Sequence, residues 1–488
     1  MSILAIDQGT TSTRALLLKA DGHASIVHTI EHRQIYPHPG WVEHDPEELI
    51  TNIRKCINNS PKVAALGIDN QGESCLAWDA DTKEAISPVI VWQDNRTHKT
   101  IEKLKHNDTE KYIMEKTGLP LDSYFSASKL AWIIENIPQA SILLNKGKLR
   151  LGTTDAFFLD RLTGQFVTDI TTASRTSLMD INTGKWDSKL CQLFNVPIET
   201  LPRIVPTTGD FGRIEKSNGE QIPVTASIVD QQASLYGHGC RQPGDVKITF
   251  GTGAFALSLT GEQPLKSPDE GLLPTIAWQR DQQSPAYALE GGVYCAGSAI
   301  NWAKSLGLFQ SFNEINHFPT PPAIQRHLAF VPALSGLACP HWDRSAAGLW
   351  IGLSLDTKPM DMVQALLEGV AFRAAEVIAA MTQLSPVDGE ISIDGGVSTN
   401  PYFCQFLADI LNRTIVVQRF SELTALGTAQ LAGSYLENTY QLISETHKGI
   451  SKQGNQNQTI YQPSGDQPMS QLYIEIFKKA IARSKSWR

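Results

Sequence analysis

Three turns that contain glycine carry the residue types that bind phosphate. The first lies at residues 7–14 (DQGTTSTR), where threonine and serine hydroxyls follow a glycine and Arg14 ends the segment. The second is residues 251–253 (GTG), and the third, residues 394–401 (DGGVSTNP), ends a strand and begins a helix with a proline suited to its first turn. Backbone N–H groups in such turns and at helix N-termini bind anions, and an adjacent carboxylate such as Asp7 can hold Mg²⁺. Taken singly, each turn is more simply explained by turn geometry alone.

A carboxylate that could act as a general base follows an apolar strand near the middle of the chain. The strand is predicted over residues 224–229, and Asp230 and Gln231 begin the next helix. If Asp230 faces a cleft, it can accept a hydroxyl proton, and Gln231 can orient the same substrate. A carboxylate at the start of a helix also serves as an N-cap, so this alternative stays open from the residues alone.

Polar and aromatic residues that suit a substrate with several hydroxyls follow two other predicted strands. Residues 70–73 (NQGE) come directly after a buried strand at 64–69, at the carboxyl end where α/β sheets bind ligands. Residues 89–94 (VIVWQD) end another strand with Trp92 and an amide, and Tyr124 precedes a predicted helix. Carboxylates and amides bind hydroxyls, and aromatic faces cover C–H surfaces. Core packing is the simpler explanation of Trp92 and Tyr124 when each is taken in isolation.

A strand–turn–strand pattern occurs twice and marks two halves of the chain. Residues 3–7 and 14–18 are apolar runs around the first turn, and residues 246–250 and 255–259 are their counterparts near the middle. Helical and strand patterns alternate between them, which predicts α/β layers. Two related α/β domains would bind a ligand in the cleft between them. The alternative is a chance similarity between two Gly-Thr hairpins.

Composition excludes several classes of partner. The chain has 488 residues, with 42 Lys and Arg against 50 Asp and Glu and a formal net charge of −8. Nucleic acids and anionic membranes recruit clustered basic residues, so we expect neither as a partner. The glycine patterns of P-loop nucleotide-binding proteins and of dinucleotide-binding Rossmann domains are both missing from the sequence.

Cysteine spacing and the N-terminal residues favour a reducing compartment. The seven cysteines are scattered, without the paired spacing of a zinc site or a disulfide framework. The N-terminal residues do not resemble a signal peptide, and the sequence has no run of about 18–20 apolar residues to span a bilayer. We therefore expect a cytoplasmic protein. Near the C-terminus, a surface loop is predicted over 450–470 and a helix over 471–487.

Together these segments resemble the FGGY family of carbohydrate kinases, and within it the glycerol kinase branch. Residues 124–136 resemble the first signature of that family, and residues 348–368 resemble the second. The similarity extends over nearly the whole chain, through residues 5–15, 40–48, 89–97, 117–136, 152–164, 171–181, 229–237, 250–261, 287–302, 330–343, 348–369, 393–411 and 423–433.

The resemblance implies a fold and a reaction. The fold is α/β, with two ribonuclease-H-like domains of the actin, hexokinase and heat-shock-chaperone type around a central cleft. We expect an N-terminal FGGY domain over 1–243, with the terminal helix at 471–488 packing on it, and a nucleotide-binding C-terminal FGGY domain over 244–470. The implied reaction is transfer of the γ-phosphate of Mg·ATP to a terminal hydroxyl of a small polyol or sugar. Family resemblance also suggests a homodimer or homotetramer.

The resemblance further implies roles for individual residues. Asp230 is expected to be the catalytic base, and Asp7 is expected to lie near the magnesium ion. The residues expected to line the polyol pocket are Gly72, Glu73, Trp92, Tyr124, Asp230, Gln231 and Phe255. The residues expected to contact ATP are Thr10, Thr11, Ser12, Arg14, Thr252, Gly297, Asn301, Gly396 and Asn400.

One residue of the expected polyol pocket departs from the family pattern. Glycerol kinases have Asn-Gln-Arg-Glu-Thr where residues 70–74 read NQGES, so Gly72 replaces an arginine that donates to glycerol in that family. Loss of a charged donor costs about 1.5–3 kcal/mol, or roughly 10- to 150-fold in affinity. Gly72 also removes the volume of a long side chain. We therefore hypothesise a polyol larger than glycerol, with four or five carbons, and keep glycerol itself as the alternative.

Two other segments depart from the pattern of bacterial glycerol kinases. Residues 215–222 (EKSNGEQI) lack the arginine of a loop that binds fructose 1,6-bisphosphate in that family, which puts this inhibition in doubt. Asn301 replaces a longer glutamine and keeps an amide.

Two other functions fit parts of the sequence. A ketose kinase of the xylulokinase branch would share the fold, but its pocket motifs differ from residues 70–73 and 90–94. A non-catalytic nucleotide switch of the actin or chaperone type would need no base beside an aromatic pocket. Such a switch would also carry a polymerisation or peptide-binding region. ATP turnover that is stimulated by polyols separates a kinase from a switch.

Overall fold

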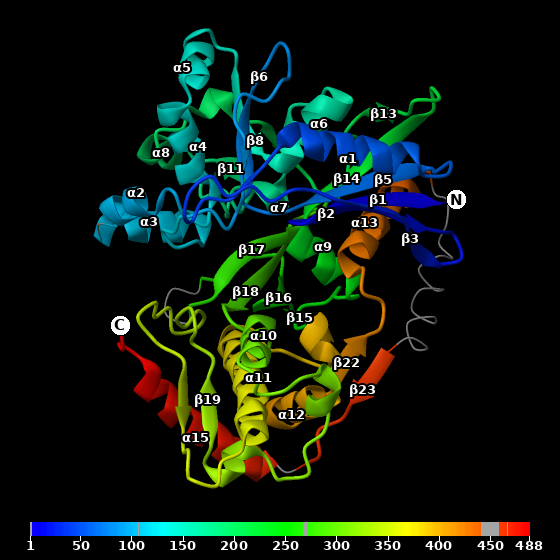
Figure 1. Cartoon of the computed structure of the whole chain (residues 1–488). Coiled ribbons are helices and arrows are strands. Elements are labelled where there is room, and N and C mark those ends of the chain that lie inside the picture. Colours follow the sequence, from blue (N-terminus) through cyan, green and yellow to red (C-terminus); the bar gives the residue numbers. More distant parts are fainter. Residues whose placement is uncertain (1, 106, 267–270, 441–457, 466) are drawn as a thin grey trace.

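The computed structural model describes residues 2–105, 107–266, 271–440, 458–465 and 467–488. Figure 1 shows two α/β lobes, one above the other, with the first half of the chain in the upper lobe and most of the second half in the lower one. The strands of the first half are β1 (Ile3–Gln8), β2 (Ser12–Leu18), β3 (Ala24–Glu31), β4 (Glu43–His44), β5 (Ala65–Asn70), β6 (Cys75–Asp79), β7 (Val89–Ile90), β8 (Leu149–Thr153), β9 (Val167–Asp169), β10 (Met179–Asp180), β11 (Lys185–Trp186), β12 (Arg203–Val205), β13 (Arg213–Glu215) and β14 (Gln221–Val229). Its helices are α1 (Pro46–Asn58), α2 (His98–Leu104), α3 (Asn107–Thr117), α4 (Ser126–Asn136), α5 (Pro138–Asn145), α6 (Thr154–Thr163), α7 (Ile170–Ala173), α8 (Ser188–Leu193) and α9 (Asp230–Gly237).

The second half contains a longer central helix and a second large sheet. Its strands are β15 (Val246–Phe250), β16 (Ala254–Gly261), β17 (Leu273–Trp278), β18 (Ala286–Val293), β19 (Ala329–Val331), β20 (Leu349–Ile351), β21 (Ile391–Asp394), β22 (Ile415–Gln418) and β23 (Gln458–Tyr461). Its helices are α10 (Gly297–Ser305), α11 (Pro359–Leu384), α12 (Pro401–Leu411), α13 (Leu423–Tyr440) and α15 (Gln467–Ser484).

The two large sheets, of six and seven strands, share a core of five strands in the same order. In the first sheet, β1 pairs antiparallel with β2 and parallel with β5, and β5 pairs parallel with β14. In the second, β15 pairs antiparallel with β16 and parallel with β21, and β21 pairs parallel with β22. The strand orders are β13-β14-β5-β1-β2-β3 and β17-β18-β16-β15-β21-β22-β23. This repeat confirms the predicted two-domain α/β fold and shows that the two Gly-Thr hairpins are equivalent parts of it.

The first sheet is buried on both faces, because helices cover each of them. Leu4 and Ile6 of β1 pack in one cluster with Ile53 of α1 and Phe157 of α6. Helix α1 begins where Asp45 accepts hydrogen bonds from two backbone N–H groups, and a proline fills its first turn. The opposite face of the sheet is covered by α9 and α13.

Helix α13 follows β22 of the second sheet in sequence but packs on the first sheet. It contacts β1, β2, β5 and β14, and it crosses α9 at two glycines. A Cβ atom at Gly237 would lie 1.9 Å from the carbonyl oxygen of Leu423, and one at Gly427 would lie 1.9 Å from that of Ala233. The division at residues 243/244 stays a prediction, but α13 was expected to belong with the second domain and instead joins a core shared by both.

The expected packing of the terminal helix on the N-terminal domain is wrong. Helix α15 contacts α12, α11, β19 and β20 of the second domain (Figure 1). Phe477 stacks on Phe372 of α11 with ring centroids 4.5 Å apart, and Tyr473 and Ile481 join the same core. The helix follows β23, an edge strand of the second sheet, after a short connection, so its apolar face meets the nearest core.

The loop predicted over 450–470 is only partly described by the structure. Residues 450–457 and 466 lie outside the described residues, and residues 458–461 form β23, which pairs antiparallel with β22. Among the helices of the described ranges, none has the length and apolarity needed to cross a bilayer.

Candidate active site

A small cavity of about 140 Å³ lies between the two domains. All seven residues predicted for a polyol pocket line it: Gly72, Glu73, Trp92, Tyr124, Asp230, Gln231 and Phe255. Five further residues complete the wall: Thr10, Arg175, Val229, Gln232 and Glu290. Phe255 lies on β16 and Glu290 on β18 of the second domain, so the cavity is complete only when both domains are in place. We call it the interdomain cavity.

Asp230 is a partly buried carboxyl group in the wall of the interdomain cavity. It is the first residue of α9, and Val229 holds the N-cap position before it, so the N-cap alternative does not describe its role. Its Oδ1 accepts a hydrogen bond from the Gln231 backbone N–H at 2.7 Å. Burial, and then the negative charges of Glu73 and Asp7, raise the pKa of Asp230 to about 7. A carboxyl with this pKa can accept a proton from a hydroxyl near neutral pH.

A buried lysine of the second domain orients the amide beside this carboxyl. Lys247 on β15 donates from Nζ to Gln231 Oε1 at 2.7 Å and to Thr249 Oγ1 at 3.0 Å. The contact leaves the NH₂ group of Gln231 as the part of that side chain able to donate toward the cavity.

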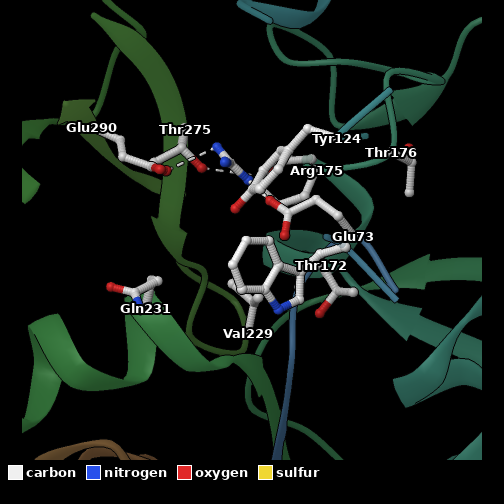
Figure 2. A network of polar contacts seen from close by, with 12 residues as sticks. Glu73, Tyr124, Thr172, Arg175, Thr176, Val229, Gln231, Thr275 and Glu290 are labelled. Atoms are coloured by element: carbon white, nitrogen blue, oxygen red, sulfur yellow. Dashed lines mark hydrogen bonds and ion pairs between the residues drawn. The ribbon is translucent and has the colours of Figure 1, made fainter. Parts of the chain in front are cut away.

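An ion-pair network joins both domains at the cavity (Figure 2). Arg175 Nε donates to Glu73 Oε1 at 2.7 Å, and Arg175 Nη1 lies 3.0 Å from Glu290 Oε2. All three side chains are buried. Burial raises the pKa of Glu73, and the Arg175 charge opposes that shift. Although burial opposes the charged form of Arg175, the charges of Glu290 and Glu73 outweigh it and raise the pKa of the guanidinium.

Sequence reasoning missed Arg175 and Glu290. Both lie in segments that carry the family resemblance, residues 171–181 and 287–302, but neither stands in a turn or strand end whose composition suggests a ligand. An arginine after a short helix and a glutamate within a strand both suit a surface position equally well. Only the approach of the two domains brings them together.

The aromatic wall is tied to the first glycine turn. The rings of Trp92 and Tyr124 meet edge to face with centroids 5.6 Å apart. Trp92 Nε1 donates to Thr10 Oγ1 at 3.2 Å, which links the interdomain cavity to the turn at residues 9–12. Lys129 Nζ donates to the backbone carbonyls of Trp92 and Tyr124 and so holds both residues.

The volume expected to be open beside Gly72 is partly filled. A Cβ atom at Gly72 would lie 2.7 Å from Cγ2 of Val229, which itself lines the cavity. Gly72 was expected to leave open the volume of a long side chain. That expectation is wrong for the Cβ position, because Val229 occupies the adjacent space. Room for a longer ligand lies elsewhere, in a neighbouring cavity of about 410 Å³ that shares Trp92, Tyr124, Phe255 and Glu290 with the interdomain cavity.

The first glycine turn joins β1 to β2 and holds the predicted phosphate and metal residues. Its turn closes through a hydrogen bond from Gly9 N–H to the Ser12 carbonyl at 3.0 Å, with Thr10 and Thr11 between them. Arg14 on β2 points across to the second domain, where its Nη1 lies 2.9 Å from Glu422 Oε2.

Asp7 faces a second carboxyl group on the neighbouring strand. Asp7 of β1 stands opposite Asp69 of β5 in register, and both are buried. Burial raises the pKa of Asp7, and burial together with the Asp7 charge raises the pKa of Asp69 well above its ordinary range. No described group of three or more His, Cys, Asp or Glu side chains could hold a metal by itself. A pair of carboxylates is nevertheless sufficient for Mg²⁺ in kinases, because substrate phosphates supply further oxygen ligands.

The other residues predicted for the nucleotide, Thr252, Gly297, Asn301, Gly396 and Asn400, lie in the second domain. The turn that contains Thr252 meets the start of α10, where Gly297 N–H donates to the Gly251 carbonyl at 3.0 Å. Gly396 begins a short 3₁₀ helix (Gly396–Thr399) at the end of β21, and a Cβ atom there would contact nothing. Because β15 and β21 are parallel, these turns share one edge of the sheet.

Two asparagines of this group differ in their freedom to bind a ligand. Asn301 lies exposed on α10. Asn400 is buried as the N-cap of α12: its Oδ1 accepts from Phe403 N–H, and its Nδ2 donates to the Ile315 carbonyl, each at 2.8 Å. The side chain of Asn400 therefore has a clear structural role.

Comparison with known proteins shows the family. The models of the N-terminal and C-terminal domains of the FGGY family of carbohydrate kinases match residues 2–237 and 246–435. The chain belongs to the FGGY family of carbohydrate kinases. Among its relatives, the glycerol kinase of Francisella philomiragia is 38% identical over 99% of both chains. The structure of Plasmodium falciparum glycerol kinase with ADP aligns with a TM-score of 0.91 and 32% identity, covering 99% of this chain and 98% of that one.

Membership of the FGGY family establishes the reaction class. The protein is an enzyme, a kinase that uses ATP to phosphorylate an alcohol group of a small polyol or sugar. A xylulose kinase of Lactobacillus acidophilus shares the fold, with a TM-score of 0.87 and 24% identity over 99% of each chain. The comparisons do not favour the ketose-kinase or nucleotide-switch alternatives. The expected oligomer and compartment stay predictions.

Proposed function

We propose that this FGGY kinase transfers the γ-phosphate of Mg·ATP to a terminal hydroxyl of glycerol or a closely related polyol. The observation that carries the proposal is the position of Asp230, a partly buried carboxyl with a pKa of about 7 in a cavity lined by hydroxyl-binding and aromatic side chains. Trp92 connects that cavity to the phosphate-binding turn through Thr10. The acceptor and the phosphate donor would thus meet at Asp230.

The reaction follows from what these side chains can do. Asp230 accepts the proton of the acceptor hydroxyl while the hydroxyl oxygen forms its bond to the γ-phosphorus and the bond from that phosphorus to ADP breaks. Gln231 and Glu73 hold the polyol hydroxyls, and Trp92, Tyr124 and Phe255 cover its C–H faces. Closure of the two domains keeps out water, which would otherwise compete as an acceptor.

The first glycine turn is assigned to the phosphates, the carboxylates beside it to the metal, and the second domain to the adenosine part of the nucleotide. Asp7, with Asp69 beside it, would hold Mg²⁺, and the ion would neutralise charge on the transferred phosphoryl group. The first turn would bind phosphates through Thr10, Thr11 and Ser12, with Arg14 next to them. The adenosine part would lie over the second domain against Thr252, Gly297, Asn301 and Gly396. Asn400 contributes by fixing the start of α12.

Glycerol is the acceptor that the interdomain cavity fits best. A cavity of about 150 Å³ holds benzene, which has six non-hydrogen atoms, as glycerol does. The cavity of about 140 Å³ matches that size. A second candidate, a polyol of four or five carbons, is favoured by the adjoining 410 Å³ cavity, into which a longer chain would extend past Tyr124 and Phe255.

A panel of C3–C6 polyols and ketoses tests the proposal in an ADP-release assay. We expect the highest kcat/KM on glycerol or on a polyol of four or five carbons. A highest value on a ketose would overturn the proposed acceptor. ATP turnover that no polyol or sugar stimulates would overturn the proposed function.

A further inference from the structure

Arg175 is a buried arginine whose surroundings differ from those of a simple structural ion pair. Its side chain is 3% exposed and lines the interdomain cavity. It stands between two carboxylates that also line the cavity, Glu73 of the first domain and Glu290 of the second (Figure 2). The ring of Phe125 lies beside the guanidinium group, with its centroid 5.5 Å from the guanidinium carbon.

The guanidinium group has donor capacity that its carboxylate partners do not use. A guanidinium carries five N–H donors in a planar fork. Nε donates to Glu73, whereas Nη1 lies 3.0 Å from Glu290 but is buried without a well-directed hydrogen bond among the described residues. A buried donor without an acceptor is costly, so an acceptor supplied by a ligand would remove that cost.

The residue at position 72 makes this donor capacity significant. Gly72 has no side chain to offer, and Val229 fills the adjacent space with a methyl group. Among the residues that line the interdomain cavity, Arg175 carries the one guanidinium or ammonium group within the described part of the chain. The remaining charged groups in that wall are the carboxyls of Glu73, Asp230 and Glu290.

We propose that Arg175 is a specificity-determining residue that binds a non-reacting hydroxyl of the acceptor polyol, in place of a side chain at position 72. The inference rests on the proposed function. A hydroxyl both accepts and donates a hydrogen bond. It accepts from Nη1 of Arg175 and donates to Glu73, while Glu290 holds the guanidinium from the second domain.

Deoxy analogues of the acceptor test this role. The readout is the ratio of kcat/KM for glycerol to that for 1,2-propanediol and for 1,3-propanediol, each of which lacks one hydroxyl. We expect the wild type to reject at least one analogue by roughly 10- to 150-fold, the range expected for a lost charged hydrogen bond. In Arg175→Gln and Arg175→Lys, the ratio falls toward one, because glycerol loses its partner and the analogue has none to lose. KM for ATP stays near its wild-type value.

The control variant is Arg373→Lys. Arg373 is also a buried arginine paired with a glutamate, Glu376, but it lies on α11 and does not line the interdomain cavity. We expect this variant to lower the melting temperature without changing the ratio. An equal fall of kcat/KM for glycerol and for both analogues in the Arg175 variants would mean a purely structural role and overturn the proposal. So would a wild type that phosphorylates glycerol without discriminating against either analogue.

The outcome separates this inference from the proposed function. If the polyol panel identifies a longer acceptor, the same ratios are measured with its own deoxy analogues. If the wild type phosphorylates no polyol, the proposed function and the inference both fail. If it phosphorylates polyols but the Arg175 variants keep the wild-type ratio, the inference alone fails.

Discussion

Asp230 is the residue that we propose as the general base, and its raised pKa also predicts that its ionised carboxyl lowers the stability of the fold. We predict that Asp230→Asn lowers kcat by roughly 10²–10⁴-fold, the usual contribution of a general base. KM for the polyol changes much less, because an amide still binds hydroxyls. Steady-state kinetics measure both. A variant that keeps wild-type kcat would show that another group accepts the proton.

The raised pKa of Asp230 predicts opposite pH dependences for activity and stability. Activity needs the ionised carboxyl, so kcat/KM rises with pH up to about 7 and then levels off. The pKa of Asp230 in the folded protein lies above its ordinary value of 3.8, so between pH 4 and 7 the folded protein holds a proton that the unfolded chain releases. The contribution of Asp230 to stability therefore falls as pH rises through this range. We therefore expect Asp230→Asn to raise the melting temperature at pH 8 more than at pH 5. An equal change at both pH values would contradict the shift.

The contact between Gly72 and Val229 predicts that the two positions change together. Gly72→Arg places a Cβ atom 2.7 Å from Val229 Cγ2, and such overpacking costs about 1–3 kcal/mol of stability. The double variant Gly72→Arg with Val229→Gly should recover much of that loss. Chemical denaturation of the two variants measures the difference. Equal stability of the single and double variants would show that the Val229 methyl moves aside freely.

Side chains at strand ends were the part of the site that sequence could predict. Glu73 and Asp230 follow the parallel strands β5 and β14, and Trp92 follows β7 of a smaller antiparallel sheet. These positions after strand ends, with the family resemblance, predicted that the three residues share one pocket. Arg175, Glu290 and Val229 could not be found in this way. Their roles depend on the distance between two domains and on a substitution at residue 72, and neither is encoded in local composition.

Among the elements, the crossing of α9 and α13 depends on two glycines. We predict that Gly427→Ala costs about 1–3 kcal/mol or more, because its Cβ atom would lie 1.9 Å from a backbone oxygen that cannot move independently. Gly433→Ala on the same helix is the matched control: its Cβ atom would lie 3.5 Å from Ile3, an ordinary contact. The control should be neutral or gain about 0.5–1 kcal/mol from the helix propensity of alanine. Similar unfolding free energies for both variants would contradict the close approach.

The elements themselves were more predictable than their packing. The strand before Asp230 and the helices near 128–136 and 154–162 follow from apolar periodicity, and the observed bounds differ by a few residues. Apolar periodicity predicts the apolar face of α15, but it does not predict the domain on which that helix packs. The polar composition around residues 458–461 suggested a loop, whereas pairing with β22 makes it a strand. Contacts with residues distant in sequence determine both the packing of α15 and the strand at residues 458–461.

For the whole molecule, a cavity walled by both domains predicts coupled binding of the two substrates. Phe255 and Glu290 of the second domain, to which the nucleotide is assigned, line the interdomain cavity. A bound polyol would therefore favour the arrangement of the two domains that also binds the nucleotide. We expect Mg·ADP to raise polyol affinity by about 5- to 150-fold, a coupling of about 1–3 kcal/mol. Isothermal titration calorimetry in both orders measures it. Independent affinities would mean that the domains do not move relative to each other on binding.

The position of α13 also constrains how this chain can be recombined with its relatives. If everything after residue 243 were exchanged with a relative, a helix from that relative would pack on the native strands β1, β5 and β14. A residue of that relative would also face Gly237. A viable hybrid would instead return to the parental sequence just before Leu423. The helix and the sheet it covers would then be inherited together, and the boundary suited to exchange would differ from the boundary suggested by chain order.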